Sequence, residues 1–251
     1  MANKHKNDSI LDEQLRYLKL SFIRENHEAY GARAAKKQLS HHEFLRSLIK
    51  GEADRRKDNA VKRRIKQARF PTLKTLDQFD WEWPDKINRL QVQNLCRLKF
   101  MENHTNIIFL GTAGLGKSHL AAAIGLKTCQ KRIPTLFTTA VDVINDLTAA
   151  RETGQLKNTL KKYIKPRLLI LDELGYLPID KIGADLLFTI ISKRYETSST
   201  IITSNRAYKD WAEIFNNDSI LTSVLLDRVL HHAETVLIEG KSYRMKNEIE
   251  I

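Results

Sequence analysis

The residues with the clearest chemical meaning form a glycine-rich run, GTAGLGKS at 111–118, which fits the pattern G-x-x-x-x-G-K-S/T. Glycines let backbone N–H groups point inward at a phosphate, and the start of a following helix adds positive partial charge. We expect Lys117 to reach the β- and γ-phosphates and the Ser118 hydroxyl to bind Mg²⁺. The pattern therefore predicts a site for ATP and Mg²⁺. The residues predicted to contact the nucleotide are Gly111, Thr112, Ala113, Gly114, Leu115, Gly116, Lys117, Ser118 and His119.

Two adjacent carboxylates follow a second apolar run, LLIL at 168–171. The run predicts a strand, and in an open α/β sheet the carboxyl ends of the strands face the ligand crevice. We expect Asp172 to hold Mg²⁺ and Glu173 to polarise the water that attacks the γ-phosphate. A kinase usually needs no such adjacent base, because its substrate supplies the nucleophile. The pair therefore favours ATP hydrolysis.

Two further polar residues could complete this reaction. Asn205 ends the apolar run STIITSN at 199–205 and could hydrogen-bond the attacking water or the γ-phosphate, although asparagine is also common in turns. Arg228 lies in LLDRVL at 225–230 and could stabilise the transition state in a neighbouring subunit, as arginines do in phosphoryl transfer. That role requires an oligomer, and a surface ion pair with Asp227 is the alternative.

Positive charge is concentrated near the amino terminus. Residues 1–75 hold 19 Lys and Arg against 9 Asp and Glu, whereas the other 176 residues hold 23 against 21. Helical spacing would lay the basic residues of 55–74 in rows, which favours contact with DNA phosphates over a basic helix that is merely solvated. The residues predicted to contact DNA are Arg55, Arg56, Lys57, Lys62, Arg63, Arg64, Lys66 and Arg69.

Alternating strands and helices are predicted from residue 106 onwards. Strands are expected at 106–110, 135–139, 167–173, 199–205 and 234–240. Helices are expected at 117–131, 140–154, 184–196, 208–215 and 219–231. This order predicts an α/β fold of the P-loop NTPase type, with three α/β/α layers around a five-stranded parallel sheet. The strand between the two motif-bearing strands favours the subclass of P-loop ATPases that carries such an additional strand.

The remaining chain is expected to form a small helical domain at 1–70 and a linker with a lead-in helix at 71–105, before an ATPase domain at 106–251. Leu11, Leu15, Leu18 and Phe22 predict one apolar stripe, interrupted at Gly31.

A second helix is expected to open at a capping box formed by Ser40 and Glu43 and to run, with a weak point at Gly51, to Pro71. Its predicted core face consists of Phe44, Leu45, Leu48 and Ile49. The predicted buried side of the lead-in helix consists of Leu90, Leu95, Leu98 and Met101.

The composition, 42% hydrophobic and 29% charged, is that of a globular protein. No apolar run approaches the ~18 residues of a membrane span, and the first ten residues lack the apolar core of a signal peptide. We therefore expect a cytoplasmic protein with no membrane partner, in which Cys96 and Cys129 are buried or half-buried thiols. The pairs His41-His42 and His231-His232 have no carboxylate or cysteine arrangement around them in the sequence, which predicts no role for them.

The succession LGTAGLGKSHLA, FTTA, LLILDELGYLP, GADLLF, ISKRYE, TSNR and LLDRVLHH resembles the IstB-like ATP-binding proteins, as does ARFPTLKTLDQFDW before it. These helper proteins are encoded beside an IstA-type transposase in bacterial insertion sequences and are related to the DnaC and DnaI helicase loaders. The similarity extends from about Leu11 to Arg244. It implies an AAA+ ATPase that forms a homo-oligomer on double-stranded DNA with ATP, deforms the duplex, and recruits and stimulates the transposase.

By this resemblance Asn205 matches the sensor asparagine and Arg228 the arginine finger. Thr112 and Ala113 stand where two prolines are common, and Ser118 where threonine is common, but the backbone donors and the hydroxyl remain. About ten residues follow the last expected strand, which leaves no room for the helical lid of most AAA+ proteins. Arg244 is the candidate substitute for the sensor arginine of that lid.

Three functions remain open: an ATPase that regulates transposition, a replicative helicase loader, and a DNA-binding scaffold in which nucleotide only stabilises the fold. DNA-stimulated ATP turnover would exclude the scaffold. A transposase reading frame immediately upstream would favour the first function over the second.

Overall fold

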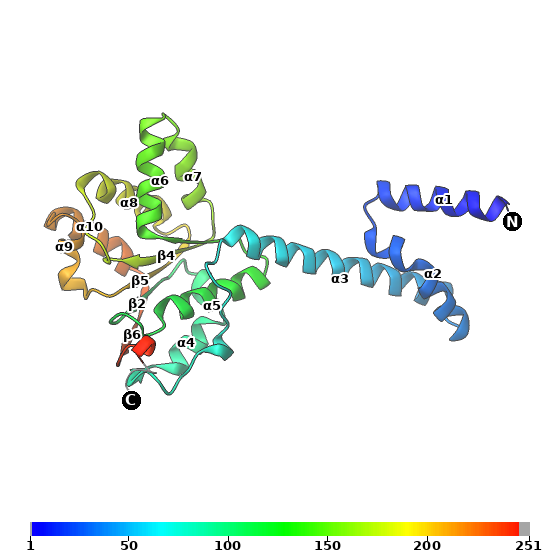
Figure 1. Cartoon of the computed structure of the whole chain (residues 1–251), viewed down its shortest axis with the longest axis horizontal. Helices are drawn as coiled ribbons and strands as arrows, with labels where there is room; N and C mark the ends of the chain where they lie inside the picture. The colour runs from blue at the N-terminus through cyan, green and yellow to red at the C-terminus, as the bar shows by residue number, and fades with distance from the viewer. Residues whose placement is uncertain (1, 246–251) are drawn as a thin grey trace. The chain divides into compact units, whose positions relative to one another are not determined.

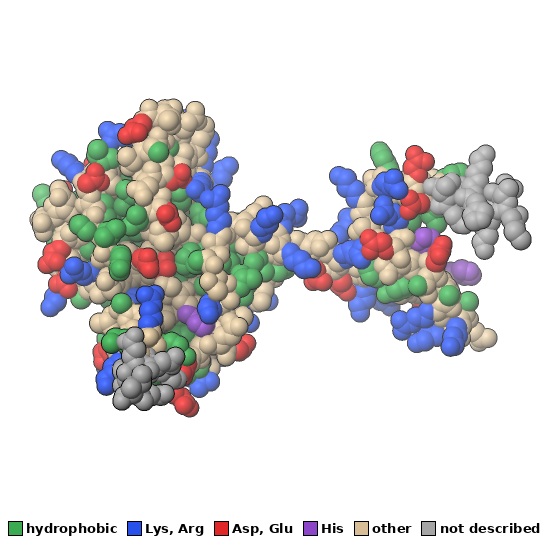
Figure 2. All heavy atoms as spheres, viewed as in Figure 1, with side chains coloured by type: hydrophobic (Ala, Val, Ile, Leu, Met, Phe, Trp, Pro, Cys, Tyr) green, Lys and Arg blue, Asp and Glu red, His purple; other side chains and the backbone are tan. Residues whose placement is uncertain are grey.

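The computed structural model describes the backbone of residues 2–245 and the side chains of residues 10–245. The chain divides into two compact units, Met1–Arg63 and Arg64–Ile251. On the face shown in Figure 2, basic and acidic side chains are interspersed over both units.

The first unit contains α1 (Ala2–Tyr17), α2 (Ser21–Lys36) and the greater part of α3 (His41–Ala68), whose end belongs to the second unit. Its core is small. The buried members are Leu15, Ile23 and Leu48, with Leu20, Tyr30 and Phe44 packed against them.

Carboxylates fix the starts of two of these helices. The predicted capping box is confirmed: the Glu43 amide donates to Ser40 Oγ (3.3 Å) and the Ser40 amide to Glu43 Oε2 (2.9 Å). Glu52, buried on α3, accepts from the backbone amides of Phe22 (2.8 Å) and Ile23 (3.3 Å). Amides in the first turn of a helix have no acceptor within the helix, so the Glu52 carboxylate satisfies two of them in α2. A negative charge at this end is also favoured by the helix dipole.

Several expectations for this unit were wrong. The stripe from Leu11 to Phe22 is not one helix face, because a turn with Lys19 at φ 55° separates α1 from α2. Helix α2 continues through Gly31, where an interruption was expected, whereas α3 runs through Gly51 as predicted. A Cβ at Gly51 would lie 2.1 Å from the Phe22 ring, so glycine there permits close packing of α2 on α3. The expected core residues Leu45 and Ile49 are exposed.

The second unit is built on a six-stranded sheet in the order β1-β6-β2-β5-β4-β3. The strands are β1 (Lys86–Ile87), β2 (Asn106–Leu110), β3 (Thr135–Thr139), β4 (Leu168–Leu174), β5 (Ser199–Ser204) and β6 (Ala233–Glu239). Strands β2 to β6 are parallel, whereas β1 is antiparallel to β6. The five expected parallel strands are confirmed, and only the sixth, antiparallel edge strand β1 was missed, since two residues are too few to show a periodic pattern.

Two apolar cores cover the two faces of this sheet. Along β4, Leu168 and Ile170 belong to the core beneath α4 and α5, whereas Leu169 and Leu171 belong to the core beneath α6, α7, α8 and α10. Figure 1 shows α4 and α5 on one side of the strands and α6, α7 and α8 on the other. The α-helices are α4 (Arg89–Leu95), α5 (Lys117–Gln130), α6 (Ala140–Glu152), α7 (Leu156–Ile164), α8 (Lys181–Arg194), α9 (Trp211–Ile214) and α10 (Ser219–Leu230). The three-layer prediction is confirmed.

The segment before β2 packs on the sheet through its aromatic residues. Phe79 is buried in the core beneath α5, with Phe70 and Trp81 packed against the same core. The lead-in helix is shorter than expected: α4 ends at Leu95 and a 3₁₀ turn, η2 (Lys99–Met101), follows. Its expected buried residue Leu90 is 64% exposed.

A buried arginine joins α7, β4 and β5. Arg194 is 1% exposed, and its guanidinium donates to the carbonyl oxygens of Tyr163 (3.0 Å), Pro166 (2.8 Å) and Ser199 (2.6 Å). Burial lowers its pKa to about 9. These contacts fix the turns that lead into β4, which bears Glu173, and into β5, which Asn205 follows.

None of the described helices combines the length and the apolar character that crossing a bilayer requires. Of the two cysteines, Cys129 is buried and Cys96 partly buried, as expected.

Candidate functional site

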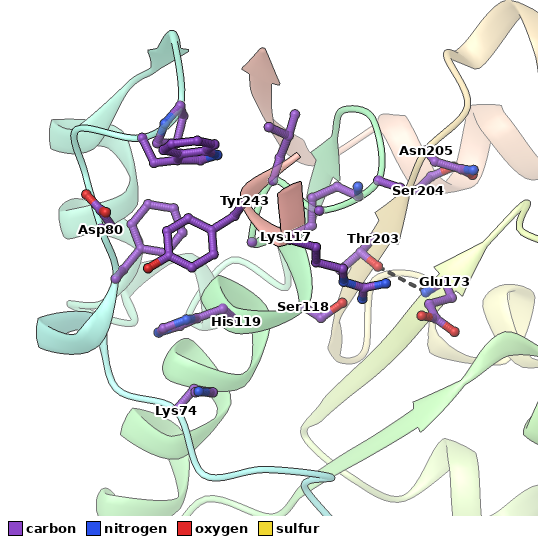
Figure 3. A pocket seen from close by; sticks show the side chains of 18 of the residues that line it. Lys74, Asp80, Lys117, Ser118, His119, Glu173, Thr203, Ser204, Asn205 and Tyr243 are labelled. Atoms are coloured by element: carbon purple, nitrogen blue, oxygen red, sulfur yellow. Dashed lines mark hydrogen bonds between the residues drawn. The ribbon is translucent and has the colours of Figure 1, made fainter. Parts of the chain in front are cut away.

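A pocket of about 400 Å³ lies at the carboxyl ends of β2, β4 and β5, a volume suited to a small ligand (Figure 3). Strand β5 lies between β2 and β4. The glycine-rich loop after β2 and polar residues at the ends of the other two strands therefore face one another, as the sequence predicted. The predicted residues that line the pocket are Ala113, Gly114, Leu115, Gly116, Lys117, Ser118, His119, Glu173 and Asn205.

The glycine-rich loop turns tightly into α5. Gly114 and Gly116 have φ of 81° and 80°, a left-handed conformation that favours glycine. A Cβ at Gly116 would also lie 2.6 Å from the Phe79 ring. Helix α5 starts at Lys117, so the free N–H groups of its first turn open onto the loop. This geometry fits a phosphate group.

Lys117 is held at the centre of the loop. Its Nζ donates to the carbonyl oxygens of Gly111 (2.7 Å) and Thr112 (2.6 Å). Burial lowers the pKa of Lys117 and the nearby charge of Arg244 lowers it further, whereas the charges of Asp172 and Glu173 raise it. The ammonium therefore lies close to both carboxylates expected to act with it.

Asp172 is the buried acid of the site, 5% exposed. Its Oδ1 accepts hydrogen bonds from Ser118 Oγ at 2.8 Å and from Thr203 Oγ1 at 2.5 Å. A carboxylate and a hydroxyl side by side are hard oxygen ligands of the kind that Mg²⁺ prefers. The two residues predicted to bind Mg²⁺ are thus adjacent, and their chemistry fits the ion.

Glu173 is exposed at the edge of the pocket, one residue beyond Asp172. Its amide donates to Thr203 Oγ1 at 3.0 Å, so one threonine contacts both acidic positions (Figure 3). The pairing of β4 with β5 shifts register between Leu171 and Leu174, and Glu173 has φ of 59°. The irregularity turns the second acid out of the strand and towards the pocket. Thr203 was missed by the sequence analysis, which singled out only Asn205 at the end of this strand.

Of the two further polar residues predicted to act in hydrolysis, Asn205 lines the pocket and Arg228 does not. Asn205 is exposed just after β5 and lines the pocket on the same side as Glu173 (Figure 3). Arg228 lies on α10 with its guanidinium 4.8 Å from the centre of the Phe188 ring. It is not among the described residues that line the pocket, and among the described side chains no ion pair joins it to Asp227.

Segments outside the predicted motifs form the far wall of the pocket. The additional lining residues are Lys74, Gln78, Phe79, Asp80, Trp83, Pro84, Tyr176, Thr203, Ser204, Tyr243 and Arg244. The 3₁₀ turn η4 (Tyr243–Met245) reaches the loop through the Tyr243 amide, which donates to the Gly114 carbonyl oxygen at 3.0 Å. Trp83 Nε1 donates to the Lys241 carbonyl oxygen at 2.9 Å, and the Trp83 and Tyr243 rings meet edge to face. Apart from Arg244, which the sequence had suggested as a sensor residue, the residues of this wall were missed because nothing in the local sequence shows that they meet.

His119 joins the loop to the segment before β1. Its Nε2 lies 2.7 Å from the Thr75 carbonyl oxygen, and its ring meets the edge of Phe79 at 5.4 Å. Burial lowers the pKa of His119, although the Thr75 carbonyl raises it in part. We infer that His119 positions the wall of the pocket.

The predicted DNA-contacting residues have unlike surroundings. Three of them are paired within the first unit: Arg55 with Glu25 (2.6 Å), Arg56 with Glu52 (3.0 Å) and Lys57 with Asp54 (3.3 Å). The exposed remainder are Lys62, Arg63, Lys66 and Arg69, while Arg64 is half-buried.

In the second unit Arg64 and Arg69 line a groove with three lysines at the end of α7, which the sequence analysis missed. The lysines are Lys161, Lys162 and Lys165. One of them, Lys162, is paired with Asp146 at 2.8 Å. Residues 156–164 were not predicted to be helical, so these charges were not recognised as one surface.

Comparisons with known proteins agree with this geometry. The model of the family described as IstB-like ATP binding protein matches residues 13–251. A Bacillus thuringiensis subsp. berliner protein, named as an ATP-binding protein of insertion sequence IS232, is 41% identical over 237 residues, or 94% of each chain. A Pseudomonas aeruginosa protein, named as an ATP-binding protein of insertion sequence IS21, is 40% identical over 238 residues, 95% of this chain and 89% of its own.

Solved structures show the same fold. The DnaC helicase loader superposes with a TM-score of 0.54 and 25% identity over 66% of this chain and 96% of its own. AMPPCP-bound DnaA from Aquifex aeolicus superposes with a TM-score of 0.56 and 22% identity over 72% of this chain and 55% of its own, which shows the AAA+ P-loop fold alone. The chain belongs to the family of IstB-like ATP-binding proteins, with relatives encoded by IS21-type insertion sequences.

Proposed function

We propose that the protein is an ATPase that assembles on double-stranded DNA with ATP, remodels the target DNA, and recruits and stimulates the transposase of its insertion sequence. The observation that carries this proposal is the contact between Ser118 and Asp172, with Glu173 held beside them by Thr203 in the pocket of Lys117. A site that only bound nucleotide would not need a second, exposed acid at this position.

The chemistry assigned to each group follows from its position. Lys117 and the first amides of α5 hold the phosphates. When bound at Ser118 and Asp172, Mg²⁺ neutralises phosphate charge. Glu173 orients the attacking water and accepts its proton, and Asn205, on the same side of the pocket, hydrogen-bonds that water or the γ-phosphate. Electrostatic stabilisation and positioning of this kind provide most of the catalysis in phosphoryl transfer.

The aromatic wall provides a place for the base. Phe79, Trp83 and Tyr243 border the pocket beyond the glycine-rich loop. Their rings offer the apolar and edge-on surface that an adenine requires. Arg244 lies in the same pocket and close to Lys117, so we assign it the sensor role that a lid arginine has in other AAA+ proteins.

Arg228 supports assembly into an oligomer. It does not line the pocket of its own chain among the described residues, and its guanidinium is only half-buried over Phe188. An arginine that acts in phosphoryl transfer must reach a γ-phosphate, so in this proposal Arg228 completes the site of a neighbouring copy.

DNA binding rests on the unpaired basic residues. Lys62 and Arg63 are exposed in the first unit, and Lys161 and Lys165 in the second. Such charges bind phosphates without reading bases. The IS names of the relatives supply the context of transposition, and hence a transposase partner.

A second function is a replicative helicase loader. The similarity to the DnaC helicase loader over 96% of that chain favours it. The two functions differ in the protein partner that ATP turnover should respond to.

The deciding experiment measures ATP turnover with Mg²⁺ alone, with duplex DNA, and with duplex DNA plus the cognate transposase or the replicative helicase. We expect duplex DNA to raise turnover and the transposase to co-purify with the ATP-bound oligomer. A response to the helicase but not to the transposase would favour the loader. No turnover under any condition would contradict the ATPase proposal.

A further inference from the structure

A second group of ligand-type side chains lies away from the nucleotide pocket. His231 and His232 follow the end of α10, and Glu196 follows α8 shortly before β5. One ligand atom from each residue lies within 4.8 Å of those from the other two, and all three side chains are exposed. Sequence alone predicted no role for this histidine pair, because the carboxylate that accompanies it comes from a distant part of the chain.

We propose that Glu196, His231 and His232 form a binding site for a transition-metal dication, represented by Zn²⁺. Two imidazoles and one carboxylate suit Zn²⁺, Ni²⁺ or Cu²⁺, whereas Mg²⁺ and Ca²⁺ prefer oxygen ligands alone. Zinc bonds of about 2.0–2.2 Å bring tetrahedral ligand atoms to roughly 3.3 Å from one another. Rotation of the exposed side chains about their χ angles can bring the three ligand atoms from within 4.8 Å to this separation.

The backbone that carries these ligands is fixed on both sides. The His232 carbonyl oxygen accepts from the Asn106 amide at the start of β2 (2.7 Å), and the His231 amide donates to the Asp227 carbonyl oxygen (3.0 Å). Next to Glu196, the Thr197 amide donates to the Arg194 carbonyl oxygen at 3.1 Å. Because the backbone is already fixed, only the remaining side-chain freedom would be lost when a metal binds.

Tyr195 supplies the outer contact typical of a metal-bound histidine. Its hydroxyl lies 2.9 Å from His231 Nδ1. In the tautomer protonated at Nδ1, the hydroxyl accepts a hydrogen bond from Nδ1–H, which leaves the Nε2 lone pair for the metal and fixes the ring. Tyr195 is thus a positioning residue and not a ligand.

The site is independent of the nucleotide pocket. Glu196 and His232 precede the amino ends of β5 and β6, whereas the pocket lies at the carboxyl ends of the strands. Strands β5 and β6 both pair with β2. A bound ion would therefore link the turn before β5 to the turn before β6. It would stabilise the sheet at the end opposite the nucleotide pocket. The proposal does not depend on ATP hydrolysis.

Zinc titration of the untagged full-length protein by calorimetry, in excess Mg²⁺, tests the site. Absorption with Co²⁺ as the probe reports the coordination geometry. We expect one equivalent of zinc in the wild type and an affinity at least tenfold lower in His231→Ala, His232→Ala and Glu196→Gln. Tyr195→Phe should weaken binding by less, because it removes no ligand.

The double variant His41→Ala/His42→Ala is the matched control, since it removes another exposed histidine pair. It should bind zinc as the wild type does, and retained nucleotide binding in every variant shows that the ATPase unit is folded. Unchanged zinc affinity in Glu196→Gln or in either of the histidine variants would overturn the three-ligand site. Loss of zinc binding in the control would overturn it as well.

Discussion

At the residue scale, Thr203 is the side chain on which both acids of the nucleotide site depend. It donates to Asp172 Oδ1 and accepts from the Glu173 amide, from a strand that separates β4 from β2. Asp172 therefore stays oriented towards Ser118, while the backbone turns Glu173 into the pocket. A threonine at this point couples the proposed magnesium ligand to the residue proposed to activate water.

Thr203→Val keeps the shape of the side chain but removes both hydrogen bonds. We expect ATP turnover to fall about tenfold to a hundredfold, as is usual when an outer contact of a metal ligand is lost. Nucleotide affinity without Mg²⁺ should change little. Thr203→Ser retains the hydroxyl and should retain turnover; equal activity in the valine and serine variants would contradict this role.

Lys117→Ala removes the only side-chain cation that the glycine-rich loop itself supplies. We expect binding of a fluorescent ATP analogue to be lost, because no other group of the loop balances the β- and γ-phosphate charge. Lys127→Ala, an exposed lysine on the same helix, is the control. Binding by Lys117→Ala that equals the control would contradict the phosphate assignment.

The chemistry of single residues was largely readable from the sequence. Lys117, Ser118, Asp172 and Glu173 were recognised because their chemistry requires adjacent or fixed spacing, and the structure brings them together. Thr203, like the aromatic wall and Glu196 beside its histidines, was not. Such contacts depend on which strands and turns become neighbours in the fold, and the local sequence does not show this.

At the scale of elements, the order of the strands positions the site. With β5 between β2 and β4, the ends of three strands meet around one pocket. Strands β2 and β4 were predicted well because each contains an apolar run that is covered on both faces. Helix α7 and strand β1 were missed, since one is rich in lysine and the other has two residues. The apolar stripe from Leu11 to Phe22 was wrongly predicted to lie on one helix, because the helical spacing of apolar residues continues across the short turn between α1 and α2.

Arg194→Met tests the buried arginine that joins α7, β4 and β5. Removal leaves several buried carbonyl oxygens without a donor, so we expect the free energy of unfolding to fall by about 3 kcal/mol. Chemical denaturation followed by circular dichroism measures it. Lys193→Met, the exposed neighbour, should have little effect, and equal stability of the two variants would contradict the role assigned to Arg194.

At the scale of the whole molecule, charge is distributed unevenly between its two units. The basic residues of α3 were predicted as one DNA-binding set, but Arg55, Arg56 and Lys57 are engaged by nearby carboxylates. Among the described residues, the exposed basic side chains without an ion pair include Lys62 and Arg63 in the first unit, and Lys66, Arg69, Lys161 and Lys165 in the second. The predicted set therefore divides into basic residues with and without an intramolecular partner, and its contact with DNA stays a prediction.

Two double variants, Lys62→Ala/Arg63→Ala and Lys161→Ala/Lys165→Ala, test the DNA contacts. Each should flatten the salt dependence of duplex binding by about 0.9 per lost phosphate contact. The double variant Lys193→Ala/Lys209→Ala removes the same charge elsewhere and should leave the slope unchanged. If all three variants flatten the slope equally, net charge rather than these surfaces governs binding.

The most direct test of the ATPase proposal is turnover by Glu173→Gln with Mg²⁺ and ATP, beside Glu152→Gln as a control for an exposed glutamate of α6. The account predicts that Glu173→Gln binds ATP as tightly as the wild type but hydrolyses it at least about a hundredfold more slowly, because the group that accepts the proton of water is gone. The control should hydrolyse ATP at the wild-type rate. Wild-type turnover by Glu173→Gln would contradict the account.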